Sequence, residues 1–268
     1  MTLIRCSISA LGLILLLGAC EDPPKAEEKP AASAAAPAVS AAPAASATAA
    51  PAPEAAAPSK PKKTLADCGK GPNAEFDQPG LEAEIRKKLQ KPDGPVSLAD
   101  LKKVHSVNLS QAPRTSQLDV CTFAHLTNLK DLFLGPGDYD DLSIVAGMKD
   151  LESLSAAHNS VHDTAPLAKL KKLDRLDLAH SQVADLSVIA ELTTLTELTL
   201  DDTAISDVSP LAKLSKLEKL GIQHTQVKDA TPLKALKKLK VLYAAGTPAD
   251  EEALTLAPIR ANGTKVID

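Results

Sequence analysis

The sequence has no tryptophan and few other aromatic residues, which together make up 2% of its 268 residues. Tight protein interfaces usually depend on buried Trp, Tyr and Arg side chains. This scarcity therefore disfavours a strongly aromatic binding surface and favours a modest or polar partner. The net charge of -4 and the pI near 5.9 provide no electrostatic footprint for nucleic acid.

Motifs that carry chemistry are also missing. The sequence has no Gly-x-Ser-x-Gly, His-Glu-x-x-His or phosphate-binding loop, and Gly135-Pro136-Gly137 precedes no helix that would bind a phosphate. No Cys-x-x-Cys occurs, which disfavours a redox or zinc motif. We predict no enzymatic activity, no catalytic residues and no cofactor.

What the chain does contain is a repeat of 22 residues. Each copy begins with Leu-x-x-Leu-x-Leu or a variant that ends in Ala156, Ile222 or Ala244, and the leading leucines are Leu129, Leu151, Leu173, Leu195, Leu217 and Leu239. In these copies a small polar residue follows the leucines, then a branched apolar residue and then an acid. The recurring acids are Asp141, Asp163, Asp185, Asp207 and Asp229. Such a period marks units that bury their apolar faces only against one another.

This motif predicts one short strand per copy. The last two leucines of the motif alternate with polar residues, and this pattern is typical of a strand with one buried face. Because each strand is followed by a return segment such as Ser209-Pro210-Leu211, successive strands must pair in parallel. The return segments predict helical or 3₁₀ turns that begin near Pro. We expect the small polar residues to lie inside the coil and bond backbone groups of the neighbouring turn.

The repeat motif is similar to the leucine-rich repeat, and the 22-residue form with Asp-x-Ser-Pro-Leu-Ala resembles the bacterial internalin class. The resemblance implies an α/β fold: a right-handed solenoid with a parallel sheet on the concave face and short helical or 3₁₀ segments on the convex face. Residues 76–95 resemble the helical N-terminal cap of such proteins, and Leu81, Ile85 and Leu89 share one helix face. We assign the cap to residues 64–103, the repeats to 104–248 and a C-terminal cap to 249–268.

The N-terminus predicts export. A positive start, an apolar run at Leu11 to Leu17 and the ending Leu17-Gly18-Ala19-Cys20 resemble a lipoprotein signal peptide of residues 1–19, with Cys20 as the lipidated residue. Residues 20–63 are rich in Ala and Pro and are predicted to form a disordered tether. The expected location is the cell envelope, with the outer membrane favoured over the inner because Glu21 follows the cysteine.

Cysteine usage agrees with this location. Cys6 leaves with the signal peptide and Cys20 carries lipid, which leaves Cys68 and Cys121 near the N-terminal cap. In an oxidising compartment we predict a disulfide between them.

The concave sheet face is the predicted partner-binding surface. Its candidate residues occupy the two exposed positions of each strand: Phe133, Ser155, Arg175, Asp177, Glu197, Thr199, Lys219 and Tyr243. The partner is predicted to be a protein, with a glycan as the alternative, and the oligomeric state stays open.

A further column of equivalent positions holds His158, His180, Asp202 and His224. Imidazole and carboxylate groups at strand spacing suggest divalent-metal binding as an alternative to a plain exposed edge. Extended strands space side chains too regularly to close a tetrahedron easily, so no metal site is assigned. Lysines recur in the return segments, and we expect them to be solvated.

Three functions compete. The first is a lipid-anchored, non-catalytic protein-interaction module of the bacterial envelope. The second is a structural spacer or assembly protein without a specific ligand, which the polar and aromatic-poor face would also suit. The third is metal capture by the histidine column.

Overall fold

The computed structural model describes residues 64, 67–69, 71–115, 117–251 and 253–268, all within one compact unit of residues 58–268. The predicted signal peptide, the lipidation site Cys20 and the predicted tether lie outside the described residues. Within the described ranges, no helix is long and apolar enough to cross a membrane.

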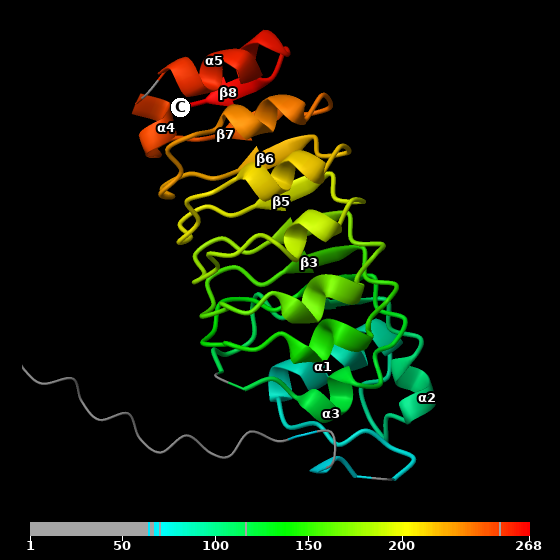
Figure 1. Cartoon of the computed structure of the whole chain (residues 1–268). Helices are drawn as coiled ribbons and strands as arrows, with labels where there is room; N and C mark the ends of the chain where they lie inside the picture. The colour runs from blue at the N-terminus through cyan, green and yellow to red at the C-terminus, as the bar shows by residue number, and fades with distance from the viewer. Residues whose placement is uncertain (1–63, 65–66, 70, 116, 252) are drawn as a thin grey trace, which may run out of the picture. The chain divides into compact units, whose positions relative to one another are not determined.

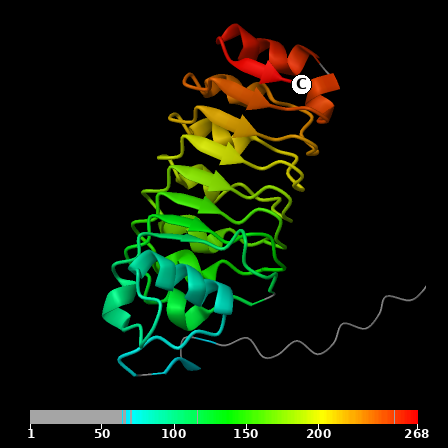
Figure 2. The ribbon, with the colours of Figure 1, turned by 180° about the vertical axis from the view of Figure 1, so that it is seen from behind.

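The described strands form one eight-stranded sheet in which neighbours in sequence are neighbours in space and all pairs are parallel (Figure 2). The strands are β1 (Ser106–Asn108), β2 (Asp131–Phe133), β3 (Ser153–Ser155), β4 (Arg175–Asp177), β5 (Glu197–Thr199), β6 (Lys219–Gly221), β7 (Val241–Tyr243) and β8 (Lys265–Ile267). Their central residues are buried leucines or valines in register, apart from the half-buried Val266. The predicted parallel solenoid is confirmed.

Short 3₁₀ segments lie across the coil from the sheet (Figure 1). They are η2 (Ser143–Gly147), η3 (Ala165–Lys169), η4 (Ile189–Glu191), η5 (Ser209–Lys213) and η6 (Thr231–Ala235). The recurring acid starts each segment by accepting the backbone N–H two residues later, as Asp207 does from Ser209 at 2.8 Å. Donors from Ser187 lower the pKa of Asp185, and donors from Thr231 lower the pKa of Asp229.

The core is a continuous column of aliphatic side chains. Leu173, Leu176 and Leu178 of one repeat are at most 2% exposed, and the equivalent leucines of the next repeat are fully buried. A single repeat leaves one face of each leucine in water, whereas stacked repeats bury it, and each buried leucine contributes about 1.5–3 kcal/mol. The stacking therefore supplies the stability that one repeat lacks.

The small polar residues lie inside the coil, but most bond differently from our expectation. The hydroxyl of Ser181 donates to the Leu178 carbonyl of its own coil at 2.6 Å, and Thr225 donates likewise to Ile222 at 2.7 Å. At these positions the Ser and Thr hydroxyls donate to the carbonyl three residues earlier, so the prediction is wrong for Ser and Thr. The longer Asn159 does cross between coils, donating to the Gly135 carbonyl at 2.9 Å.

Three helices precede or interrupt the first coils. They are α1 (Pro79–Leu89), α2 (Leu98–Leu101) and α3 (Val120–Phe123). Helix α1 buries Leu81 and Ile85 and packs beside β1, so it covers the apolar end that the first coil would otherwise expose.

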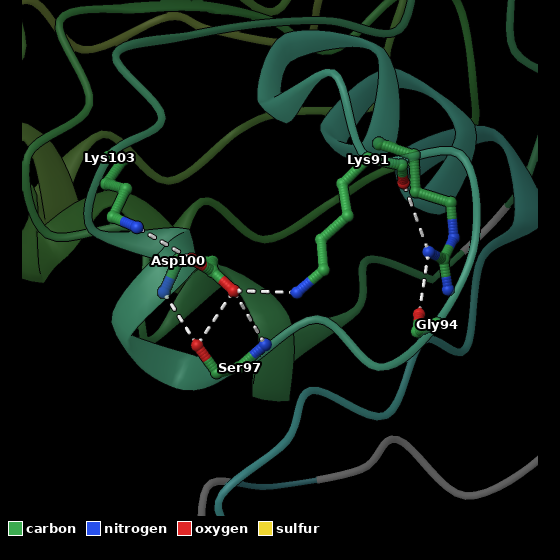
Figure 3. Close-up of polar contacts among 6 residues, drawn as sticks. Lys91, Gly94, Ser97, Asp100 and Lys103 are labelled. Atoms are coloured by element: carbon green, nitrogen blue, oxygen red, sulfur yellow. Dashed lines mark hydrogen bonds and ion pairs between the residues drawn. The ribbon is translucent and has the colours of Figure 1, made fainter.

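The start of α2 holds a charged cluster (Figure 3). Ser97 and Asp100 form a reciprocal capping box, and the Asp100 carboxylate also contacts the ammonium groups of Lys103 at 2.8 Å and Lys91 at 3.3 Å. Lys103 first, then Ser97 and Lys91, hold the pKa of Asp100 far below its ordinary value. The cluster fixes the loop between α1 and α2.

The last repeat exchanges its 3₁₀ segment for two helices. Where the Asp-x-Ser-Pro phrase is lost, α4 (Pro248–Glu251) and α5 (Ala253–Ala261) follow β7. Helix α5 packs against η6, and β8 then pairs with β7. The C-terminal end of the core is thereby covered.

Candidate functional site

The sheet face brings the predicted partner-binding residues together in two columns. In the first, Arg175 pairs in register with Glu197, which pairs with Lys219; in the second, Asp177 pairs with Thr199. Phe133, Arg175, Glu197 and Lys219 are exposed, while Ser155, Asp177, Thr199 and Tyr243 are half-buried. Whether these residues bind a partner stays a prediction.

The N-terminal half of this face is internally bonded. The Arg175 guanidinium lies 3.9 Å from the Asp131 carboxylate, two strands away, across the short side chain of Ser153. On the second column, Ser155 donates to Asp177 at 2.9 Å, and the Ala179 N–H donates to the other carboxylate oxygen at 3.1 Å. The Asp177 carboxylate is therefore held in place before any partner arrives.

Asp201 belongs to this surface, although the strand pattern did not identify it. It lies two residues beyond β5, where the neighbouring repeats have Ala179 and Gln223. Its carboxylate accepts the Gln223 N–H at 2.7 Å and occupies the space left by Gly221, where a Cβ would lie 2.8 Å from Oδ1. An acid facing a glycine on the next repeat was the sequence signal that could have found it.

Burial raises the pKa of Asp201, and the nearby charges of Asp202 and Asp177 raise it further, against the opposing Gln223 hydrogen bond and the nearby His224. Three carboxylates therefore gather at the strand ends of β4 and β5. Asp202 lies beside His180 and His224, whereas Asp177 and Asp201 form no ion pair among the described residues, and their negative charge suits a cationic group.

Aromatic side chains mark the two ends of the face. Phe133 on β2 is 40% exposed. The Lys219 ammonium lies over the ring of Tyr243 on β7, 5.7 Å from its centroid. At about 4.8 Å per strand, the two rings lie roughly 24 Å apart along the sheet. Small or polar residues occupy the second column between them.

The histidine column has a backbone explanation. His158, His180, Asp202 and His224 all have positive φ values, between 53° and 58°, and Gly246 occupies the same position in the next repeat with φ 69°. Left-handed backbone disfavours most side chains, and His and Asp are among the residues that tolerate it best. The turn after each strand thus selects these residue types without any ligand.

Side chains along this column touch in sequence. The rings of His158 and His180 stack with centroids 4.1 Å apart, and His180 Nε2 lies 3.5 Å from Asp202. His224 Nδ1 lies 3.3 Å from the same carboxylate. In the described part of the chain, no group of three or more His, Cys, Asp or Glu side chains is placed to hold a metal ion. The stacked geometry therefore gives no support to metal capture.

The structure joins Cys68 to Cys121 by a disulfide, with Cα atoms 5.3 Å apart. Cys121 lies in α3, whose first turn is capped by Asp119: the buried carboxylate accepts the Thr122 N–H at 2.9 Å. Asp119 also accepts the Asp77 N–H at 2.9 Å. The segment before α1 is thus fastened to the first repeats at two points.

No family model and no curated protein sequence matches this chain. Solved structures do match. Internalin C2 of Listeria monocytogenes superposes with a TM-score of 0.57 and 24% identity over 72% of this chain and 92% of its own. A second Listeria monocytogenes internalin superposes with a TM-score of 0.54 and 24% identity over 64% of this chain and 57% of its own.

A leucine-rich-repeat protein of Leptospira interrogans superposes with a TM-score of 0.51 and 18% identity over 63% of this chain and 50% of its own. At these identities the likeness shows a shared leucine-rich-repeat fold. The chain is internalin-like in architecture.

Proposed function

We propose that this chain is a lipid-anchored, non-catalytic interaction module of the bacterial cell envelope that presents its sheet face to a protein partner. The observation that carries the proposal is the pre-arranged charge on that face. Asp177 is fixed by two hydrogen bonds, and Asp201 and Asp202 add charge beside it. Fixed and partly desolvated carboxylates provide orientation and charge recognition for a cationic group.

Glu197 strengthens this interpretation. It is exposed at the centre of the face and has no ion-pair partner among the described residues, although Arg175 and Lys219 flank it in register. A structural salt-bridge ladder would have paired it. The surface therefore retains charge for a partner.

The test is crosslinking and pull-down from intact envelopes with an Arg175→Glu, Glu197→Arg variant. The exchange reverses charge on the sheet face and leaves net charge unchanged. The matched control is Glu191→Lys with Lys213→Glu, which exchanges an exposed ion pair of the return segments. We expect the sheet-face variant to lose the partner and the control to retain it. Equal capture by all three proteins would contradict the proposal.

Anchoring is tested separately. We infer lipidation at Cys20 from the Leu17-Gly18-Ala19-Cys20 sequence, and the envelope location depends on it. Mass spectrometry should find acyl groups on a mature N-terminal cysteine of the native protein, and a Cys20→Ser variant should carry none. A native protein with an unmodified N-terminus would refute lipidation without touching the sheet-face proposal.

A structural spacer is the second candidate, because the second column between Phe133 and Tyr243 carries no other aromatic side chain. In that case deletion of residues 21–63 would impair the cell, while the sheet-face exchange would have no phenotype. A glycan partner would replace a protein if sugar polymers, rather than proteins, were recovered in the pull-down.

A further inference from the structure

The two edges of the sheet carry opposite charge. A two-residue turn precedes each of the strands β1 to β7, and these turns form one edge. Lysine occupies eight of these positions and an acid only one: Lys102, Lys103, Lys149, Lys171, Lys172, Lys216, Lys237, Lys238 and Asp150. We call the row formed by these seven turns the lysine edge. All eight lysines are exposed.

The opposite side of the coil, which runs from the strand ends to the starts of the 3₁₀ segments, is acidic, and we call it the acidic edge. It includes Asp201, Asp202 and the five acids that start the 3₁₀ segments, with Lys228 as a basic exception. A net charge of -4 therefore conceals a separation of charge across the width of the sheet. The net charge alone argues against a polyanionic partner. The row of lysines on one edge is compatible with such a partner.

Much of the charge on the lysine edge is not neutralised. Lys103 pairs with Asp100 at 2.8 Å and Lys172 with Asp150 at 2.5 Å. The other six lysines form no ion pair with the residues that the structure describes. Seven neighbouring turns at about 4.8 Å spacing give a row of roughly 30 Å. Ion-pair networks that merely stabilised the repeats would have matched these lysines with acids.

We propose that the lysine edge lies against anionic lipid headgroups and orients the domain on a bilayer. The edge is a row of protruding turns whose other described residues are Thr, Asn, Ser and Asp. It therefore lacks the aromatic platforms that single-stranded nucleic acid requires. Point charges on long flexible stems suit a flat anionic surface, where each lysine strengthens binding about fivefold.

The choice of a bilayer as the partner rests on the proposed lipid anchor. The proposed anchor would hold the domain within reach of a bilayer, and a basic patch is a recognised second attachment signal. With the lysine edge on the membrane, the acidic edge faces away from it. The sheet face then stands beside the membrane, and its charged columns remain accessible.

Vesicle flotation with residues 21–268 tests the proposal without the lipid. This fragment keeps the whole compact unit, including the core from Leu81 to Ile259 and the disulfide. The test variant is Lys149→Glu, Lys216→Glu, Lys238→Glu, because these three side chains are exposed and make no ion pair among the described residues. The control is Lys87→Glu, Lys219→Glu, Lys228→Glu, which changes net charge equally at exposed positions off the lysine edge.

The native fragment should bind vesicles containing phosphatidylglycerol, and high salt should release it. Loss of three lysines should weaken partitioning by about 10²-fold, while the control variant partitions like the native fragment. Equal unfolding midpoints for the three proteins would exclude misfolding as the cause.

Three results would overturn the proposal. The native fragment could fail to bind these vesicles, both variants could weaken equally, or the native fragment could bind inorganic polyphosphate and not vesicles. The last result would assign the lysine edge to a soluble polyanion. None of the three bears on acylation of Cys20 or on the sheet-face exchange, so the proposals fail separately.

Discussion

The repeats and the N-terminal cap solve the same structural problem in different ways. In the repeats, the coils with Ser181, Thr203 and Thr225 each bury one small hydroxyl that bonds its own backbone, and one acid starts each 3₁₀ segment. In the cap, burial depends on contacts made once: the disulfide, the Asp119 carboxylate and the Asp100 cluster. Repeated local contacts thus stabilise the repeats, whereas the N-terminal cap depends on contacts that occur only once.

This difference predicts how damage spreads. Stability in a stacked repeat array is approximately a sum of repeat and nearest-neighbour terms. A lost contact in one repeat weakens that repeat and its neighbours. A lost contact in the cap exposes the end of the whole core, because α1 covers the first coil.

The largest expected effect comes from removing the disulfide with Cys68→Ser and Cys121→Ser. The bond closes a loop with a sequence separation of 53. Chain entropy for such a loop predicts a loss of about 4 kcal/mol in the free energy of unfolding. Denaturant titration measures it, and hydrogen exchange should show the loss of protection concentrated between residues 71 and 129. Uniform loss along all repeats would contradict the distinction between cap and array.

An intermediate effect is expected from paired changes of capping acids. Asp119→Ala removes acceptors of the Thr122 and Asp77 N–H groups from a buried site, and we expect a loss of about 3 kcal/mol. Asp185→Ala removes an exposed cap of one repeat and should cost about 1 kcal/mol. Thermal unfolding of both variants gives the comparison. Equal losses would mean that the cap is no more dependent on single contacts than the repeats.

The smallest expected effect concerns Asp201, which lies in the repeats but, unlike the exposed Asp185, is partly buried. Its pKa is raised in the folded protein, so its ionisation destabilises the fold as pH rises through the interval from the unfolded pKa, near 4, to the folded pKa. Asp201→Asn keeps an acceptor for Gln223. It should raise stability at pH 7 by at most about 0.5 kcal/mol, since the site is half-exposed and screened.

The gain from Asp201→Asn should vanish at pH 3, where the native side chain is already protonated. Unfolding curves at both pH values test this. The repeat acid Asp185, whose pKa is lowered, should show the opposite dependence: its contribution is present above about pH 4 and is lost as pH falls below that value. A loss of stability at pH 7 in Asp201→Asn would show that the charge is compensated in a way the structure does not contain.

The solenoid was predictable because its signal repeats. One leucine pattern, copied six times, gave the strand positions, their parallel pairing and the residues Phe133 to Tyr243 on one face. The site was less predictable. Asp201 was missed because its position, two residues beyond β5, was not among the columns compared. The histidine column suggested a metal, whereas the left-handed backbone at His158 to His224 accounts for those residue types.

The sequence by itself determined the period, the buried faces and the resemblance to leucine-rich repeats, because these depend on local spacing and on which side chains avoid water. The tertiary structure decided which coil each hydroxyl bonds, which carboxylates meet at Asp201, and that lysines scattered over five turns share one edge. Those features arise from stacking, which brings residues 22 positions apart to within one strand spacing. A charge pattern across a sheet exists only once the strands are side by side.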